Sequence, residues 1–240
     1  MDTTKITKPA RKMLKVKRCG AVIVAAGNAS RMGGIDKVMA QLDGEPMILR
    51  TVRAFENCDV IKEIVVVTRP DLIVPISDLC RDMEKVTAVV CGGSSRQESV
   101  ELGLNALSKK VELAAVQDGA RPLISWQVID RTVRAANSYG AAAPAIPVKD
   151  TIKVVTGGIV KETPDRKTLQ AVQTPQVFDI DLLKGALQKA KEDGAEVTDD
   201  CSAVERLGMS VKIVEGDERN IKVTTPMDLK IAQLLLEEML

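Results

Sequence analysis

Residues 19–37 read CGAVIVAAGNASRMGGIDK, and this stretch decides the fold. Its first part, 19–25, is a continuous apolar run, which is typical of a strand buried on both faces of a parallel sheet. The run ends in a glycine-rich turn that also carries Arg31 and Lys37. A turn after the first strand of an α/β sheet presents backbone N–H groups at the usual ligand crevice, so the segment predicts a cradle for phosphate groups.

Two common phosphate-binding motifs are absent from this turn. A Walker A loop requires Gly-Lys-Ser or Gly-Lys-Thr, a dinucleotide fold requires G-x-G-x-x-G, and neither pattern occurs here. The segment therefore disfavours adenylate kinases and dehydrogenases. Its composition alone is also compatible with an ordinary βα turn that carries charges at the surface.

Apolar runs and helical patterns alternate along the rest of the chain. This alternation predicts one α/β domain with three layers, in which a mostly parallel, Rossmann-like sheet lies between helices. A capping box at Ser95–Glu98 and a cap at Thr225 followed by Pro226 predict two helix starts. Strands are expected at 64–68, 86–90, 113–117, 142–148 and 211–214, and helices at 47–55, 72–83, 95–107, 127–136, 180–190 and 227–239.

One segment, 144–178, interrupts the alternation. It contains several prolines and a Gly157-Gly158 turn signal between two β-rich stretches, 151–155 and 159–162. We therefore expect a β-hairpin arm inserted in the fold, and such arms often contact a partner subunit.

The N-terminal residues 1–18 contain Lys and Arg but lack the apolar core of a signal peptide. We expect them to form a disordered basic tail in front of a single domain at 19–240.

The composition excludes several classes of protein. The chain has 240 residues, 45% apolar and 28% charged, which is enough to bury a core and excludes disorder and collagen-like structure. Thirty-four Lys and Arg against 33 Asp and Glu leave a net charge of +1, so no global field attracts nucleic acid or an anionic membrane. Aromatic residues make up 2%, too few for platforms that stack single-stranded nucleic acid.

The absence of histidine narrows the chemistry further. Without any His, the sequence excludes Ser-His-Asp and Cys-His nucleophiles and His-ligated zinc. The five cysteines are scattered without a C-x-x-C motif, so we expect neither a disulfide framework nor a zinc site, and a reducing cytoplasm fits best. No apolar run approaches the roughly 20 residues that a membrane span requires.

A glycine pair follows the strand expected at 86–90. Gly92 and Gly93 would let the backbone approach a flat ligand, and Ser99 lies one turn into a helix whose N-terminus favours anions. A capped turn would explain the glycines but leaves Ser99 without a role.

Two more polar groups lie at predicted strand ends or helix starts. Asp118, after the strand at 113–117, could hold a metal or a sugar hydroxyl, or form a surface pair with Arg121. Lys222 precedes the last helix, and taken alone it would be read as a solvated lysine.

A series of short motifs stands in order along residues 19–240. Together they resemble the 2-C-methyl-D-erythritol 4-phosphate cytidylyltransferases of the non-mevalonate isoprenoid pathway. The motifs are A-A-G-x-x-x-R-M at 25–32, Lys37, G-G-x-x-R-x-x-S-V at 92–100, D-x-A-R-P at 118–122, V-K-D-T at 148–151, T-x-D-R at 163–166, Q-T-P-Q at 173–176, T-D-D at 198–200 and N-I-K-V-T at 220–224.

The resemblance implies transfer of CMP from CTP to methylerythritol phosphate, giving 4-diphosphocytidyl-2-C-methyl-D-erythritol and pyrophosphate. In the family, the residues matching Arg31 and Lys37 stabilise the charge that develops on the α-phosphate of CTP. The resemblance also implies Mg²⁺, held mainly by the CTP phosphates with Asp118 as a possible ligand. The nucleotide itself would be held by Ala25, Ala26, Gly27, Gly92, Gly93 and Ser99.

The resemblance further implies a homodimer, because the segment matching 142–172 crosses to the other subunit in this family. Arg166 would then act in trans, and with Lys222 it would position the substrate phosphate. The polyol would be bound by Asp118, Arg121, Thr151 and Thr198.

This chemistry is consistent with the missing histidine. The nucleophile is a phosphate monoester oxygen with a second pKa of about 6, so it is largely dianionic at neutral pH and needs no general base. Cations must instead offset the repulsion between this dianion and the triphosphate, and they must hold the oxygen in line with the leaving pyrophosphate.

Two other functions stay open at this level. A ribitol 5-phosphate cytidylyltransferase would share the nucleotide loops and differ in the polyol pocket, although Arg166 and the Q-T-P-Q run favour the methylerythritol enzyme. A nucleotide-binding module without turnover would be expected to lack at least one of four cations, but the sequence contains them all: Arg31, Lys37, Arg166 and Lys222.

Overall fold

The protein is described here by a computed structural model that covers residues 15–27 and 38–238. The described residues form a central eight-stranded sheet. From one edge, the strands follow the order β5 (Val86–Cys91), β4 (Ile61–Thr68), β1 (Cys19–Val24), β6 (Leu113–Asp118), β11 (Gln176–Asp179) and β7 (Ala141–Pro147), and β7 also pairs with β10 (Gln170–Val172) and β12 (Lys212–Glu215).

The first four strands of this order run parallel, and β11 runs antiparallel between β6 and β7. In the middle, Val22 of β1 is opposite Val65 of β4 on one side and Val116 of β6 on the other. These three side chains are fully buried because helices cover both faces of the sheet. The predicted α/β class and mostly parallel sheet are confirmed.

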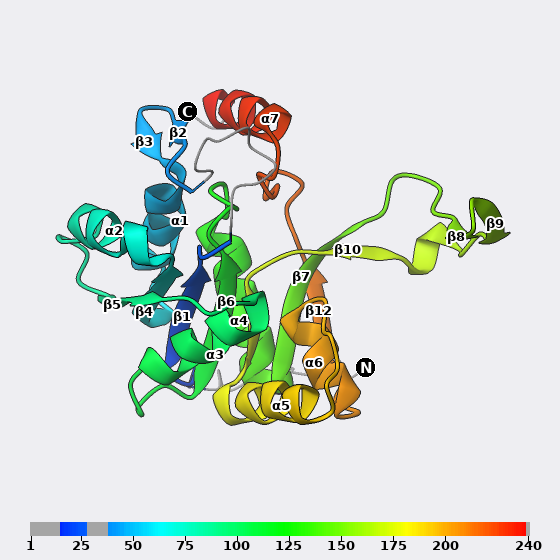
Figure 1. The fold of residues 1–240 in the computed structure, drawn as a ribbon, viewed down its shortest axis with the longest axis horizontal. Helices are drawn as coiled ribbons and strands as arrows, with labels where there is room; N and C mark the ends of the chain where they lie inside the picture. Colours follow the sequence, from blue (N-terminus) through cyan, green and yellow to red (C-terminus); the bar gives the residue numbers. More distant parts are fainter. Residues whose placement is uncertain (1–14, 28–37, 239–240) are drawn as a thin grey trace, which may run out of the picture.

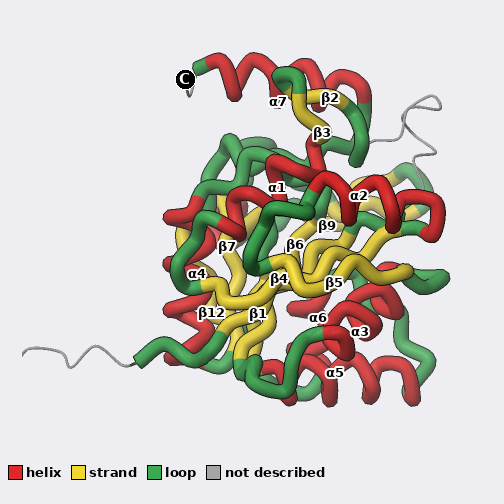
Figure 2. Tube along the Cα trace, turned by 90° about the vertical axis from the view of Figure 1, so that its left-hand side faces the viewer, coloured by secondary structure: helices red, strands yellow, loops and turns green. Residues whose placement is uncertain are grey.

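Two helical layers enclose the sheet, with one apolar core on each side of it (Figure 2). Phe55 and Ile76 are buried in the first core, and Leu104 and Phe178 in the second. The first layer contains α1 (Met47–Glu56), α2 (Ile73–Leu79) and α4 (Trp126–Tyr139), and the second contains α3 (Arg96–Ala106), α5 (Ile180–Glu192) and α6 (Asp200–Arg206).

The last helix, α7 (Pro226–Glu237), lies apart from these layers (Figure 1). It packs Ala232 and Leu236 against a small cluster that includes Leu42 from the β2 (Gln41–Leu42) and β3 (Glu45–Pro46) hairpin. Its predicted start is confirmed, because Thr225 and Asp228 form a reciprocal capping box.

Several predicted boundaries need correction. The helix expected at 72–83 is a 3-10 turn, η1 (Pro70–Leu72), followed by α2, which ends at Leu79. The capping box at Ser95 is only half formed: Ser95 accepts from the backbone N–H of Glu98, but the Glu98 carboxylate accepts from Ser94 instead. The sequence patterns did not reveal β10, β11 or α6, which are too short for a clear apolar period.

The inserted segment forms an arm that extends away from the body (Figure 1). Its hairpin is present, with β8 (Val154–Thr156) shifted from the expected 151–155 and β9 (Ile159–Glu162) as expected. Because β7 and β10 belong to the main sheet, the projecting arm comprises residues 148–169.

The expected tail lies outside the described residues up to position 14. Residues 17 and 18 are bound to the rest of the domain. The backbone N–H of Lys17 donates to the Asn137 side chain, and the Lys17 ammonium group donates to Asp179 (2.9 Å). The backbone N–H of Arg18 donates to Glu112.

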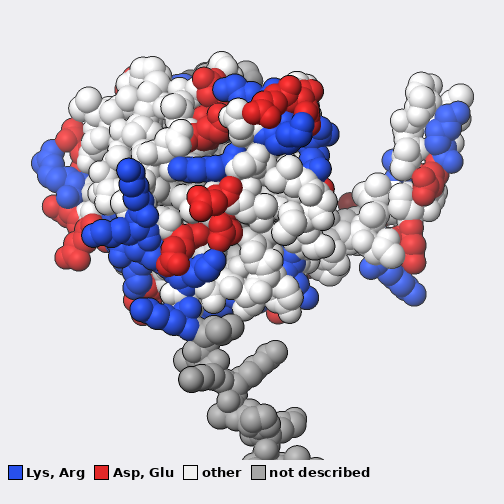
Figure 3. Space-filling view, turned by 90° about the horizontal axis from the view of Figure 1, so that it is seen from below, with Lys and Arg blue, Asp and Glu red and all other residues white. Residues whose placement is uncertain are grey.

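Charged side chains of both signs are mixed on one face of the molecule (Figure 3). On the face shown in Figure 3, Lys and Arg side chains lie beside Asp and Glu side chains. This mixture agrees with the net charge of +1 and gives this face no field of a single sign. Among the described residues, no helix is long and apolar enough to cross a membrane.

Candidate active site

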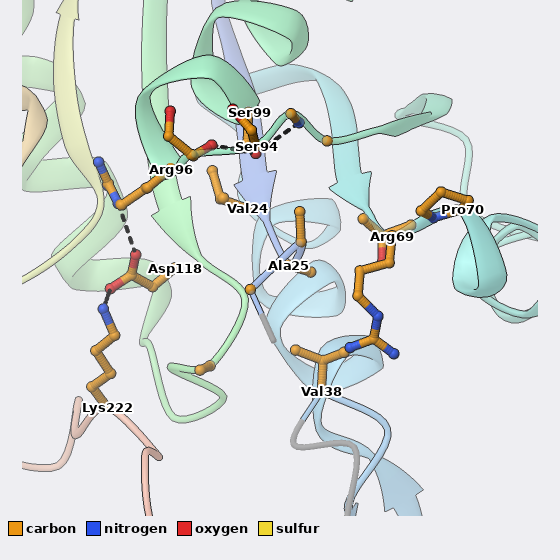
Figure 4. A pocket seen from close by; sticks show the side chains of 17 residues that line it. Val24, Ala25, Val38, Arg69, Pro70, Ser94, Arg96, Ser99, Asp118 and Lys222 are labelled. Carbon is orange, nitrogen blue, oxygen red and sulfur yellow. Dashed lines mark hydrogen bonds and ion pairs between the residues drawn. The ribbon is translucent and has the colours of Figure 1, made fainter. Parts of the chain in front are cut away.

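A cavity of about 440 Å³ opens where β1, β4, β5 and β6 end (Figure 4). We call it the strand-end pocket. Arg96 and Asp118 lie on one side of it, and Val38 and Arg69 lie on the other. Parallel strands place their carboxyl ends at one edge of the sheet, which explains why residues far apart in sequence meet here.

Two backbone turns approach each other at the floor of this pocket. A Cβ atom at Gly92 would collide with the Cβ atom of Ala26 and lie 2.9 Å from the Oγ atom of Ser99. Only glycine therefore lets the turn after β5 pack this closely on the turn after β1. The Ser99 hydroxyl accepts from the N–H of Gly93 (3.1 Å) and donates to the carbonyl of Ser95 (2.8 Å). Ser99 thus fixes the glycine turn, a role that the capping pattern alone did not reveal.

Asp118, the last residue of β6, lies at the centre of a charged cluster. One of its oxygens is 2.7 Å from the Lys222 ammonium group and 3.7 Å from the Arg121 Nε atom. The other oxygen is 3.7 Å from the Arg96 Nε atom. The residue is 8% exposed, and burial by itself would raise the pKa of its carboxyl group. The surrounding cations, with Lys222 the strongest, outweigh burial and lower that pKa, so Asp118 stays ionised.

Arg96, the first residue of α3, is held by the first residue of α6. Its two terminal nitrogens donate to the two carboxylate oxygens of Asp200, at 3.0 and 2.7 Å. Burial by itself would lower the pKa of Arg96, but the Asp200 carboxylate outweighs burial and raises it. A paired guanidinium group of fixed orientation therefore forms part of the pocket wall.

The segment that carries Lys222 is attached to the body at both sides. The Val223 N–H donates to the carbonyl of Ala120 (2.8 Å), and the buried Asn220 amide donates to the carbonyl of Thr174 (2.9 Å). Arg121 donates to the carbonyl of Asn220 (2.6 Å). These bonds tie the chain before α7 to the end of β6, which brings Lys222 to Asp118.

The predicted site residues fall into four groups. Arg31 and Lys37 lie outside the described residues. Arg121 lies next to the pocket lining, beside Asp118. Three residues are exposed and lie outside the pocket: Thr151 and Arg166 on the projecting arm, and Thr198 just before α6. The strand-end pocket is lined by Ala25, Ala26, Gly27, Gly92, Gly93, Ser99, Asp118 and Lys222.

The sequence interpretation passed over Arg96 and Asp200. Both residues belong to motifs named above, G-G-x-x-R and T-D-D. The sequence of these motifs does not show that the two side chains form an ion pair. Asn220 and Gln173 were missed in the same way: the Gln173 amide donates to the carbonyl of Asp217 (2.8 Å) and supports the segment before Lys222.

Asp118 does not fit the role of a magnesium ligand. Its oxygens face three cationic side chains, which would repel a divalent cation. Nor do the described residues contain any cluster of three carboxylate or thiol groups that could hold a metal ion.

The sequence and the fold were compared with those of known proteins. Residues 19–238 match the sequence profile of the 2-C-methyl-D-erythritol 4-phosphate cytidylyltransferase family. The chain belongs to this family. It is therefore a nucleotidyltransferase, as its motifs predicted.

Named cytidylyltransferases match almost the whole chain. The 2-C-methyl-D-erythritol 4-phosphate cytidylyltransferase of Caldanaerobacter subterraneus is 44% identical over 91% of this chain and 98% of its own. That of Geobacillus kaustophilus is 45% identical over 90% and 96%.

Solved structures share the fold. The 4-diphosphocytidyl-2C-methyl-D-erythritol synthase of Anaerococcus prevotii has a TM-score of 0.86 and 30% identity, covering 95% of this chain and 100% of its own. The 2-C-methyl-D-erythritol 4-phosphate cytidylyltransferase of Thermus thermophilus has a TM-score of 0.75 and 32% identity, covering 90% and 98%.

Proposed function

We propose that this protein transfers CMP from CTP to the phosphate of 2-C-methyl-D-erythritol 4-phosphate, releasing pyrophosphate, in isoprenoid precursor biosynthesis. The observation that carries the proposal is the Lys222–Asp118 pair at the rim of a pocket floored by glycine turns, in a chain of this family. The backbone of the glycine turns would contact the nucleotide, and the Lys222 ammonium group would bind the phosphate of the second substrate. Ribitol 5-phosphate is the less favoured acceptor, because the relatives described above carry the methylerythritol name.

The nucleotide would lie against the turns that meet at Gly92 and Ala26. The absence of a side chain at Gly92 lets the two turns pack together beneath the base and ribose, while Ser99 keeps the Gly93 N–H in place. Arg31 and Lys37, predicted at the same turn of the first strand, would stabilise the charge that develops on the α-phosphate.

The second substrate would enter on the side of Lys222. Its phosphate is the nucleophile, already dianionic at neutral pH, and attacks the α-phosphorus as pyrophosphate leaves on the opposite side. Lys222 has ammonium protons left after it donates to Asp118, and it can present these to the incoming phosphate. Asp118 would hold that ammonium group in place and, with Arg121 and Thr198, would face the polyol hydroxyls.

A divalent ion, expected to be Mg²⁺, would bind to the triphosphate oxygens and water. The cationic surroundings of Asp118 support this placement. The ion would supply positive charge that lowers the repulsion between the two phosphate groups.

We also propose that the active form is a homodimer in which the projecting arm reaches the partner. Within one chain, Arg166 lies on the arm and donates to the carbonyl of Lys149 (2.6 Å), away from the pocket lining. The hairpin carries exposed apolar side chains, with Ile159 65% and Val155 52% exposed. A partner body would cover this surface and would receive Arg166 and Thr151 at its own pocket.

The cellular location is proposed on the cysteines. All five are free, and four of them are buried. Burial raises the pKa of Cys80 to about 11, so its thiol is inert. Free thiols are typical of a reducing compartment, and we propose the cytoplasm.

One assay tests the reaction directly. Pyrophosphate release is measured with Mg²⁺ and CTP, with methylerythritol 4-phosphate in one reaction and ribitol 5-phosphate in another. Release only with the former is expected. Release only with ribitol 5-phosphate would mean that this is the acceptor and that the mechanism is unchanged. No pyrophosphate release in either reaction would favour a nucleotide-binding module without turnover.

A further inference from the structure

We propose that Asp200 is a positioning residue for this reaction: it fixes Arg96, and through Arg96 it sets where Asp118 holds Lys222. The inference rests on the proposed function, in which Lys222 positions the acceptor phosphate. It adds a residue that lies behind the pocket lining and cannot touch either substrate, since its side chain is 1% exposed.

The geometry of Arg96 carries the first step. Its two terminal nitrogens both bond to Asp200, which leaves its Nε–H as the donor nearest to Asp118, at 3.7 Å. A guanidinium group is planar, so a bidentate partner at one end fixes the direction of the Nε–H at the other. Asp200 therefore decides which way Arg96 faces Asp118.

The second step runs through the two oxygens of Asp118. One oxygen faces Arg96, and the other bonds to Lys222 at 2.7 Å (Figure 4). A carboxylate attracted on one side by a fixed cation cannot turn freely on the other. Charges of alternating sign thus form a row from Asp200 through Arg96 and Asp118 to Lys222.

Asp200 is itself rigidly held. The carboxamide oxygen of Gln176 accepts from the backbone N–H groups of Asp200 (3.0 Å) and Cys201 (3.1 Å), and its nitrogen donates to Asp199 (2.7 Å). Gln176 is buried on β11 and pairs in register with Val116 of β6, the strand that ends in Asp118. Asp200 and Asp118 are therefore both anchored to the same part of the sheet.

A merely structural role would be to join α6 to α3. The two roles differ in their consequences. A structural pair affects stability and both substrates alike, whereas a positioning residue affects the acceptor phosphate and depends on Asp118.

The test compares Asp200→Asn with Asp193→Asn. Asp193 accepts from Lys189 (2.6 Å) and Arg206 (3.3 Å), so its substitution also removes an ion pair from α6, but at the end away from the pocket. We expect Asp200→Asn to lower kcat/KM for the acceptor about tenfold or more, with the KM for CTP changed less than about twofold. Asp193→Asn should change neither.

Dependence on Asp118 is tested by a double-mutant cycle. In an Asp118→Asn background, Asp200→Asn should cost less than about twofold, because the group it acts through is gone. Independent effects that multiply, or an Asp200→Asn enzyme with normal acceptor kinetics, would overturn the proposal.

Two further measurements apply if Asp200→Asn does not fold or if the wild-type protein shows no turnover. If Asp200→Asn does not fold, Arg96→Lys removes the planar fork while keeping the charge, and it should show the same acceptor-specific loss. If the wild-type protein shows no turnover, the proposed function fails, but the row of charges can still be tested. The carboxyl ¹³C resonance of Asp118 should then shift in Asp200→Asn and not in Asp193→Asn, and an unmoved resonance would refute the row.

Discussion

At the rim of the strand-end pocket, charged side chains from three separate parts of the chain lie together: Asp118 is 8% exposed and faces Lys222, Arg96 and Arg121. The projecting arm, 148–169, has the opposite character. Its hairpin side chains are exposed, and the Arg166 side chain donates to the carbonyl of Lys149, which also lies on the arm. The rim cluster forms within one chain, whereas no described residue of the body covers the apolar hairpin side chains of the arm.

The difference is the one expected if the active site is shared between subunits, as we propose. Side chains that must be oriented before substrate arrives are fixed by the body, where burial strengthens their interactions. Under the proposed dimer, the side chains that complete the site are carried on the projecting arm, whose position the partner would define. Each prediction below tests one half of this comparison.

The largest effect is expected from removing one cation of each region. Lys222→Ala and Arg166→Ala should each lower kcat/KM by about 10²–10³-fold, because each removes positive charge from the phosphates in the transition state. Circular dichroism should show that both variants stay folded.

Mixing these two inactive variants separates the regions. If the arm acts in trans, equal mixing gives about half mixed dimers, each with one complete site, and restores about a quarter of the wild-type activity. No recovery after subunit exchange would place Arg166 in the site of its own chain.

Loss of the dimer is the next effect. Ile159→Asp puts a charge on the apolar hairpin and should give monomers in sedimentation at micromolar concentration, with activity lost. The thermal midpoint of the body should hardly change. Val74→Asp, at an equally exposed apolar position on α2, should leave the dimer intact, and wild-type protein that sediments as a monomer would contradict the assembly itself.

A smaller effect is expected at the pocket floor. Gly92→Ala should raise the KM for CTP about tenfold, because the new methyl group pushes apart the turns at Ala26 and Ser99. Gly185→Ala is the matched control, since no atom lies within 4 Å of its Cβ position. It should leave the kinetics unchanged and, as a helical glycine, should stabilise the fold by roughly 0.5–1 kcal/mol. A normal KM for CTP in Gly92→Ala would show that the turns have room to spare.

The pH dependence of stability reports on Asp118. Its folded pKa lies below that of the unfolded chain, about 3.9, so the carboxylate stabilises the fold above that pH, and this contribution is lost as pH falls through the folded pKa. Urea unfolding should show Asp118→Asn about 1.5–3 kcal/mol less stable than wild type at pH 7. The gap should narrow as pH falls below about 4. A gap that is constant with pH would mean that charge is not the cause.

The smallest effect is expected where the arm begins. Lys149 and Glu218 form an ion pair at 2.5 Å, but both side chains are largely exposed, at 70% and 61%. Glu218→Gln should therefore shift the thermal midpoint by less than about 2 °C, measured by calorimetry at low and high salt. A larger, salt-dependent loss would mean that the body holds the arm more firmly than its exposure indicates.

Much of this protein follows from its sequence alone. The apolar run at 19–25, with further apolar runs and helical patterns in alternation, determines an α/β sheet. Few architectures both hydrogen-bond the buried backbone groups and bury the apolar side chains. The lack of histidine excludes catalysis by histidine, and the order of the motifs indicates a nucleotidyltransferase. The same motifs identify the family.

Only the tertiary structure decided how the charged residues are used. Nothing in the letters of Arg96 and Asp200 shows that they pair, since that contact depends on α3 and α6 lying on the same face of the sheet. The short strands β10 and β11 are equally hidden, because they become strands only by pairing with β7 and β6. Local sequence encodes local periodicity, while contacts between distant residues arise from the packing of the whole chain.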